Sequence, residues 1–359
     1  RIHFETSSSL RSPYQRDRDR VIHSTAFRRL KHKTQVFVNT TGDHYRTRIT
    51  HSLEVAQIAR TLAKYFNLNE DLCETISISH DLGHTPFGHA GEDALNDCMA
   101  SYGGFDHNIQ TLRIVTLLEN KYYNFKGLNL SVETIDGLVK HNGRVLNKAK
   151  YEIILGKNFF KNKINYLNSP SLEAQLAGIS DDIAYNSHDL EDGLRAKLYT
   201  IDDLKNIPIL SKIINKHKKF IKQKGIDLVL RQIIREIINE MVKDVIKTTK
   251  KNLVKYKIKT IKDVYKAQLP LVSFSNNMAL FDLNIKKFLR EKMYYSPSVL
   301  VKTNEGKKII ETLFAKIIEK PKKYIKKEKI EERSIERIVS DFIAGMTDRF
   351  AINLYQNIK

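Results

Sequence analysis

Three histidines and one aspartate stand close together in the run HDLGHTPFGH at residues 80–89. Imidazole and carboxylate groups bind divalent metal ions and transfer protons near neutral pH. The adjacent pair His80-Asp81, followed by His84 and His89, has the composition that metal and phosphate chemistry needs and that core packing does not. The run therefore predicts an enzyme.

A metal centre needs more ligands than the His80-Asp81 pair supplies. His51 precedes the pair, and the run Asp181-Asp182 on a later predicted helix offers a further carboxylate, so the chain can supply two imidazoles and two carboxylates. Such a set suits manganese, iron, cobalt, nickel or zinc better than magnesium, which prefers oxygen ligands. We expect one divalent ion per site, and these residues do not choose among the metals. About two octahedral positions would remain for a water and a phosphate oxygen.

A second group of polar residues follows the pair. His84, His89 and His107 crowd one region of the chain, and Glu92 stands three residues after His89, on the same face of a predicted helix. A carboxylate there fixes the tautomer of the imidazole and raises its basicity. Alone, Glu92 would be an ordinary charge near a helix N-terminus. The crowding of histidines favours a proton-transfer pair instead.

Basic side chains stand before His51. Lys33, Arg46 and Arg48 are the candidates. A guanidinium at this place could hold phosphate oxygens through paired hydrogen bonds. Lone arginines are usually only solvated, so the residue type by itself does not choose among the three.

Helices must position these residues. Apolar residues recur every three or four positions in residues 51–66, which predicts an amphipathic helix. A second helix is predicted over residues 69–82, with Asn69 as its cap and Gly83 as its stop. The short connection between the two makes them antiparallel and brings His51 to face His80. Other helices are predicted over residues 90–99, 109–119 and 172–194, and basic amphipathic stretches over residues 210–258.

The pattern as a whole predicts an all-α, or mainly α, fold. Strand signals are confined to residues 34–38 and 45–48, a small hairpin at most. The chain shows no internal repeat and no glycine-rich phosphate loop. We expect a catalytic core with its N-terminal segment at residues 1–204. A lysine-rich helical region at residues 205–359 should pack on this core without folding independently.

Composition limits the partners and the compartment. A formal net charge of +20 makes nucleotides, single-stranded nucleic acid or another anionic surface plausible partners. A solvated lysine-rich surface, as an AT-rich genome would encode, explains the charge equally well. No apolar run approaches a membrane span and no signal peptide is visible, which predicts a soluble, cytoplasmic protein. Cys73 and Cys98 lack the spacing of a zinc or disulfide framework, so we expect reduced, buried thiols.

The residues assembled so far resemble the HD superfamily of metal-dependent phosphohydrolases and, within it, the deoxyguanosinetriphosphate triphosphohydrolase family. The likeness covers nearly the whole chain and is therefore far more specific than a His-Asp pair. It rests on residues 16–30, 47–55, 80–92, 104–108, 172–185 and 341–349. Gly178 and Ser180 depart from the family pattern, and little of the chain beyond residue 204 matches before the last block.

The resemblance implies roles for individual residues. The metal would be held by His51, His80, Asp81 and Asp181. His89 and Glu92 would transfer the proton, with His107 near the α-phosphate and His84 close by. The implied substrate contacts are Arg48 on phosphate, Gln35 and Asp189 on the sugar 3′-hydroxyl, and Tyr185 against the deoxyribose, where its ring would leave no room for a 2′-hydroxyl.

The implied reaction is water attack at the α-phosphorus of a deoxynucleoside triphosphate, dGTP or several dNTPs, releasing the deoxynucleoside and inorganic triphosphate. The resemblance also implies a homo-oligomer, a tetramer or hexamer, in which a dNTP at subunit contacts activates. Two alternatives stay open. One is another HD nucleotidase or phosphodiesterase, whose product would be phosphate or pyrophosphate. The other is a basic protein that binds single-stranded nucleic acid and keeps a residual metal site.

Overall fold

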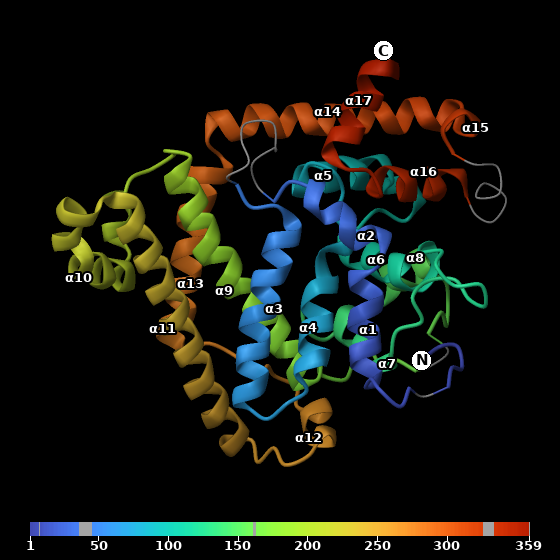
Figure 1. Ribbon diagram of the computed structural model, residues 1–359. Helices are drawn as coiled ribbons and strands as arrows, with labels where there is room; N and C mark the ends of the chain where they lie inside the picture. The colour runs from blue at the N-terminus through green and yellow to red at the C-terminus, as the bar shows by residue number, and fades with distance from the viewer. Residues whose placement is uncertain (7, 36–44, 161–162, 326–333, 359) are drawn as a thin grey trace.

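The computed structural model describes residues 1–6, 8–35, 45–160, 163–325 and 334–358. Its regular elements are helices, and the β pairing among these residues is confined to two isolated bridges. The prediction of an all-α fold is therefore confirmed. Figure 1 shows the helices wrapped around a central group of three, with α14 lying across one end of the molecule.

Three helices form this central group: α3 (Arg48–Tyr65), α4 (Glu70–Ser79) and α9 (Leu172–Arg195), which pack on one another. The apolar stripe of α3, including Val55 and Leu62, is fully buried, as the three-to-four spacing predicts. Asn69 caps α4 by accepting a hydrogen bond from the Leu72 amide at 2.9 Å. The predicted pair of antiparallel helices with a short connection is thus present.

The end of α4 differs from the prediction. The helix stops at Ser79, and residues His80–Gly83 form the 3-10 turn η2. Gly83 does not adopt a left-handed conformation, so it is no helix stop. A Cβ there would lie 2.0 Å from the His107 carbonyl oxygen and 2.4 Å from the Thr111 amide nitrogen. Glycine is needed because the backbone of α6 crosses at this point.

The other elements of the first half surround the central helices. They are α1 (Pro13–Ile22), α2 (Thr25–Arg29), η1 (Leu30–His32), α5 (Gly88–Cys98), η3 (Ala100–Tyr102), α6 (His107–Arg113), the π turn η4 (Ile114–Leu118), α7 (Val132–Val139) and α8 (Ala149–Leu155). The helices predicted over residues 90–99, 109–119 and 172–194 are present with shifted ends, the second of them as α6 plus η4.

The second half continues with helices that pack on the first. They are η5 (Asp203–Asn206), α10 (Pro208–Lys224), α11 (Ile226–Lys255), α12 (Ile261–Lys266), α13 (Asn276–Leu289), the π turn η6 (Arg290–Tyr294), α14 (Pro297–Glu319), α15 (Pro321–Tyr324), α16 (Ile335–Ala344) and α17 (Asp348–Ile358). The basic stretch over residues 210–258 thus becomes α10 and α11, which join at Gly225.

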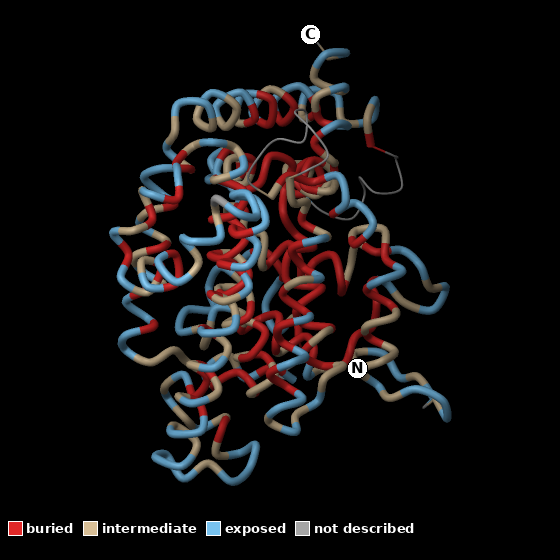
Figure 2. The backbone as a smooth tube through the Cα atoms, turned by 60° about the vertical axis from the view of Figure 1, so that its left-hand side comes forward, coloured by how far each residue is buried: buried red, intermediate tan, exposed pale blue. Residues whose placement is uncertain are grey.

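The hydrophobic core is shared between the two halves. One cluster combines Val55 of α3 with Ile233 of α11 and Ile285 of α13. Another combines Leu95 of α5 with Leu313 of α14. Buried segments gather in the middle of the molecule in Figure 2. The helices beyond residue 204 therefore bury apolar surface that the first half supplies, while the division at residue 204 itself stays a prediction.

The predicted hairpin falls largely on residues 36–44, which lie outside the described residues. At its two described ends, Thr34 and Thr47 form an isolated antiparallel bridge. Arg48, expected in the second strand, instead begins α3. The change matters for function because it places Arg48 one helical turn before His51.

Two further predictions concern the compartment. Across the described part of the chain, no helix is long and apolar enough to cross a membrane. Cys73 and Cys98 are both free thiols, as expected. Cys73 is buried, but Cys98 at the end of α5 is only half-buried and packs against the apolar cluster that α5 shares with α14.

The close crossing at Gly83 gives a test of the fold. Gly83→Ala should destabilise the protein by about 1–3 kcal/mol, because the added methyl group meets backbone atoms that cannot move aside independently. Urea unfolding measures the change. The control is Lys251→Ala on the exposed face of α11, which adds no atom to a helix crossing. A loss for Gly83→Ala no larger than the loss for Lys251→Ala would contradict the proposed crossing.

Candidate metal centre

Three potential ligands converge from three elements. His51 lies in the first turn of α3, His80 begins η2, and Asp181 lies in α9. The His51 Nε2 atom is 2.9 Å from the Asp181 Oδ1 atom, and His80 Nε2 is 3.7 Å from the same oxygen. All the ligand atoms of this group lie within 4.8 Å of one another. The spacing fits one divalent cation.

The hydrogen bonds of His80 prepare it as a ligand. Its Nδ1 lies 2.5 Å from the Ser77 carbonyl oxygen, which only accepts, so Nδ1 carries the proton. The Nε2 atom is then a lone-pair donor, buried and without a hydrogen-bond partner among the described residues. An imidazole held through one nitrogen by a carbonyl, with the other nitrogen free, is typical of metal-binding histidines. The residues present therefore fit a metal.

Asp81 lies beside this group rather than inside it. Its Oδ2 forms an ion pair of 2.8 Å with Arg48, and its Oδ1 is 3.4 Å from His80 Nε2 and 3.1 Å from His84 Nε2. Burial alone would raise the pKa of this carboxyl, but His80 and Arg48 outweigh it and hold the pKa well below its usual range. Asp81 is therefore an anion shared by both groups of histidines.

The charges of the metal group are coupled. Burial would raise the pKa of Asp181, but His80, His141 and His51 hold it well below its usual value. Burial would lower the pKa of His51, but its hydrogen bond to Asp181 raises it overall. For His80 burial prevails and the pKa is lowered, so the ring is neutral. A deprotonated carboxylate next to a neutral imidazole is the state that binds a metal.

His141, which sequence reasoning did not single out, belongs to the same place. Its ring stacks on His80 with centroids 4.9 Å apart, and its Nε2 is 3.5 Å from Asp181 Oδ2. A Cβ at Gly178 would lie 3.1 Å from the His141 carbonyl oxygen. Gly178 thus lets the chain after α7 approach α9. Residue type was the only signal for His141 in the sequence.

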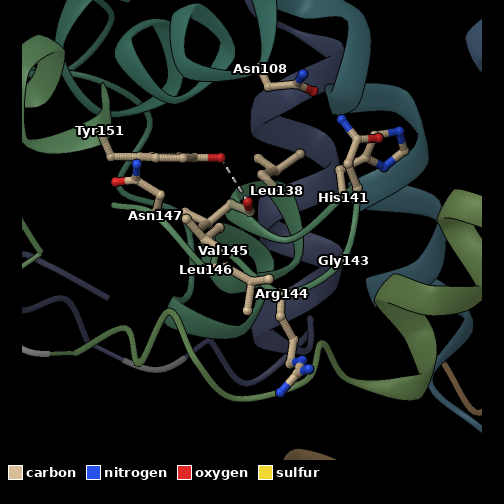
Figure 3. Close-up of a pocket in the computed structure, with 11 residues that line it drawn as sticks. Asn108, Leu138, His141, Gly143, Arg144, Val145, Leu146, Asn147 and Tyr151 are labelled. Carbon is tan, nitrogen blue, oxygen red and sulfur yellow. Dashed lines mark hydrogen bonds between the residues drawn. The ribbon is translucent and has the colours of Figure 1, made fainter. Parts of the chain in front are cut away.

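A cavity of about 230 Å³ adjoins the centre on the side of His141. Figure 3 shows His141 and Asn108 at one end of its lining and Arg144 at the other, with Tyr151 donating a hydrogen bond to the Val139 carbonyl. The lining is mixed, with amide, imidazole and guanidinium groups. His51, His80 and Asp181 do not line this cavity, so it lies next to the metal group.

The second group of polar residues gathers around Glu92 on α5. His107 donates its backbone amide to Glu92 Oε1 at 2.9 Å and lies 2.8 Å from it through Nδ1. His89 Nδ1 is 3.3 Å from Glu92 Oε2. The expected contact between His89 and Glu92 is present, but the shorter contacts are those of His107.

Glu92 fixes the charge of this group. Burial would raise its pKa, but hydrogen bonds from His107 and His89 lower it below the usual range. Burial would lower the pKa of His107, but Glu92 raises it overall. His84 is fully buried, and burial together with Arg48 keeps its pKa well below normal. The group thus combines one protonatable imidazole with one neutral imidazole.

Arg48 is the basic residue with free donors. Its side chain is buried and bonds to Asp81 through Nη1, while Nε and Nη2 have no partner among the described residues. Buried N–H donors of a guanidinium that lack an acceptor destabilise the folded state unless an anion binds to them. Arg48 therefore marks a place for an anionic group between the two groups of histidines.

The other two basic candidates are already occupied. Arg46 contacts Glu54, Glu191 and Asp192, at 3.2, 2.6 and 2.7 Å. The Lys33 ammonium donates to the carbonyl oxygens of His84 and Ala344. Burial lowers the pKa of Lys33 to about 7. Both side chains hold the protein together and do not face a ligand.

The expected substrate residues surround the same place. The Gln35 side-chain oxygen is buried without a partner among the described residues, and a Cβ at Gly88 would lie 3.3 Å from both the Gln35 carbonyl oxygen and Arg48 Nη2. Asp189 on α9 accepts a hydrogen bond from the Tyr294 hydroxyl. The rings of Tyr185 and Tyr294 lie 6.2 Å apart. Tyr294, from η6, had no signal in the sequence.

The first residue of α17 holds the loop between the histidines. The Phe87 amide donates to Asp348 Oδ1 at 3.0 Å, and the Thr34 amide donates to Oδ2 at 2.8 Å. Phe87 has a φ of 63°, a strained value for a residue with a side chain. Asp348 thus fixes the backbone between His84 and His89 from the far end of the chain.

Comparisons with known proteins agree with this geometry. Residues 48–186 match the HD domain family and residues 272–357 match the phosphohydrolase-associated domain. The first match contains the metal group and the second contains Tyr294 and Asp348. The fold is that of an HD-domain phosphohydrolase.

Curated relatives narrow this class. A deoxyguanosinetriphosphate triphosphohydrolase-like protein of Pelagibacter ubique is 57% identical over 100% of this chain and 96% of its own length. Proteins of the same description from Bartonella henselae and Bartonella quintana are 49% and 47% identical over 100% of this chain and 92% of theirs. The chain belongs to the deoxyguanosinetriphosphate triphosphohydrolase-like family, as the sequence predicts.

Asp348→Asn tests the hold on the loop. An amide has one acceptor oxygen, so one of the two backbone amides should lose its partner. We expect hydrogen exchange of the peptide containing Phe87 to become about 5- to 150-fold faster, from a loss of about 1–3 kcal/mol. Asp93→Asn, which removes an exposed ion pair to Lys307, is the control. Unchanged exchange in Asp348→Asn would argue against the proposed hold.

The buried carboxyl group of Asp189 predicts how the free energy of unfolding depends on pH. Burial raises its pKa to about 7 in the folded protein, whereas the unfolded value is near 3.9. Between these values the folded state binds more protons than the unfolded state, so this residue makes the free energy of unfolding fall as pH rises. Asp189→Asn removes the effect and keeps an acceptor for Tyr294.

Urea unfolding of both proteins at pH 4.5 and pH 8 measures the difference. The variant should gain stability relative to the wild type at the higher pH, on the order of a few kcal/mol. Parallel pH dependences for the two proteins would show that Asp189 does not titrate in this range.

Proposed function

We propose that this protein hydrolyses deoxynucleoside triphosphates, dGTP or several dNTPs, to the deoxynucleoside and inorganic triphosphate. The observation that carries the proposal is the position of Arg48. Its free donors lie beside Asp81, which contacts a metal group on one side and the Glu92 group on the other. A phosphate held there would meet both groups at once.

His51, His80 and Asp181 would hold the metal, with Asp81 able to complete the set. When bound, a divalent ion polarises a phosphate oxygen and lowers the pKa of a water molecule. We favour manganese, while iron, cobalt, nickel, zinc and magnesium remain candidates for the test. His141, stacked on His80, holds the ring in place.

Arg48 binds the phosphate oxygens and stabilises the charge that develops on them in the transition state. The imidazoles around Glu92 supply the proton that the leaving group needs. His89 is two-thirds exposed and lies 3.3 Å from Glu92, so it is accessible to a substrate. We assign His89 the proton for the departing 5′-oxygen and Glu92 its orientation. His107 and His84 face the α-phosphate.

The residues on α9 select the sugar. Tyr185 is half-buried and would pack against the deoxyribose, where a 2′-hydroxyl would meet its ring. Asp189 and Gln35 would bind the 3′-hydroxyl. Tyr294 donates to Asp189 and so orients its second oxygen. The preference for deoxynucleotides thus follows from the shape around Tyr185.

The proposal also covers the oligomeric state and the cellular compartment. We infer a homo-oligomer, tetramer or hexamer, in which a dNTP at subunit contacts raises activity. We also place the enzyme in the cytoplasm, where its two free thiols stay reduced. Single-stranded nucleic acid is a further candidate ligand because of the net charge of +20.

The test is a panel of the four dNTPs and the four ribonucleotides, assayed by product chromatography with several divalent metals, with and without a second dNTP. We expect tripolyphosphate and deoxynucleoside from at least one dNTP, little product from ribonucleotides, and no activity after chelation. Asp181→Asn should lower kcat by about a thousandfold or more, since one ligand carboxylate is lost. Asp202→Asn, at an exposed remote carboxylate, is the control.

The alternatives give different results. Phosphate or pyrophosphate as the product would indicate another HD nucleotidase or a phosphodiesterase. No product from any nucleotide, together with salt-sensitive binding of single-stranded DNA that His80→Ala does not change, would favour the nucleic-acid-binding protein.

A further inference from the structure

Three histidines direct the same ring nitrogen, Nδ1, toward the carboxylate of Glu92. The Nδ1 atoms of His107, His89 and His84 lie 2.9, 3.3 and 3.9 Å from Glu92 Oε2. The ligand atoms of all four residues lie within 4.8 Å of one another. A tetrahedral zinc ion, with bonds of about 2.0–2.1 Å, holds its ligand atoms roughly 3.3 Å apart. The three distances to Glu92 Oε2 lie around that value.

The tautomer of His84 leaves a lone pair inside this group. Its Nε2 is 3.1 Å from the carboxylate of Asp81, which accepts, so the ring proton belongs on Nε2. The Nδ1 atom is therefore unprotonated. The side chain is only 2% exposed, and Nδ1 has no hydrogen-bond partner among the described residues. A buried lone pair without a donor is costly, and a cation would satisfy it.

The rings are also held in position without a ligand. The His84 and His107 rings stack with centroids 3.9 Å apart, and the His107 amide is bound to Glu92. His89, two-thirds exposed at the start of α5, is the one ligand that reaches the group from the surface. The buried His84 and the half-buried His107 are thus fixed, and the accessible His89 is free to close over an ion.

We propose that His84, His89, Glu92 and His107 form a second cation site, distinct from His51, His80 and Asp181, that binds zinc. Three imidazoles with one carboxylate form a donor set that zinc uses in proteins, whereas magnesium and calcium prefer oxygen ligands. The consequence rests on the proposed function. A zinc ion here engages His89 and Glu92, so the proton for the leaving group cannot be transferred and excess zinc inhibits the enzyme.

Equilibrium dialysis of the metal-free full-length protein against zinc, without nucleotide, tests the site. We expect two zinc ions per chain in the wild type and one in Glu92→Gln, whose amide oxygen still accepts from the His107 backbone. Asp181→Asn should keep the second ion while weakening the first. His217→Gln is the matched control, because His217 and Glu236 form a contact of 2.7 Å on α10 and α11 far from the site. It should still bind two.

The visible spectrum of bound Co²⁺ reports the coordination geometry of the second cation site. Titration with Co²⁺ should give the strong visible absorption of a tetrahedral ion, and Glu92→Gln should lose it. If Glu92→Gln does not fold, as judged by circular dichroism, His89→Asn replaces it, since an exposed side chain does not support the core. It should weaken the second ion at least about tenfold. One zinc per wild-type chain, or two in folded Glu92→Gln or His89→Asn at unchanged affinity, overturns the proposal.

Failure of the site and failure of the proposed function are distinguishable. Two bound zinc ions in a protein that hydrolyses no nucleotide would support the site and refute the activity. An active manganese enzyme that holds a single zinc ion would refute the site and keep the activity. With both correct, zinc added to the manganese enzyme should abolish turnover as the second ion binds.

Discussion

The buried carboxylate of Asp81 is the interaction on which the rest of the structure depends. It bonds to Arg48 at 2.8 Å and lies 3.1 and 3.4 Å from the Nε2 atoms of His84 and His80. A buried charge without partners costs several kcal/mol, so these groups must stay together for the fold to persist. This requirement ties the start of α3 to η2 and to the loop that follows. The same constraint leaves two donors of Arg48 free between the two groups of histidines.

Residues from the C-terminal half of the chain hold parts of the site that the N-terminal half forms. Asp348 fixes the backbone of Phe87 between two of the histidines, and Tyr294 donates to Asp189. Lys33 joins the same assembly by bonding to the carbonyl oxygens of His84 and Ala344. The residues beyond 204 therefore do more than cover an apolar face. They hold the strained backbone of Phe87 and the buried carboxyl group of Asp189.

Glu92 and its three imidazoles serve two chemistries in our proposals. With a proton on one ring, the group is an acid beside a phosphate site. With all three Nδ1 atoms unprotonated, it is a set of ligands. A carboxylate surrounded by imidazoles favours both states, because it stabilises a positive charge whether a proton or a metal ion carries it. The choice between them depends on the metal supply, so the enzyme would respond to zinc through its own catalytic residues.

The sequence alone determined the all-α class, the antiparallel pair that brings His51 toward His80, and the family, because helical periodicity and residue spacing are local properties. The resemblance implied Arg48 as the phosphate-binding residue, but the residue types alone did not show which of Lys33, Arg46 and Arg48 has free donors. Glu54 of α3 and the adjacent Glu191 and Asp192 of α9 saturate Arg46, and only packing brings α9 to this place. His141 and Tyr294 stood out neither by spacing nor by neighbours. The tertiary structure decided their roles, since contacts across about 60–105 residues depend on how helices cross.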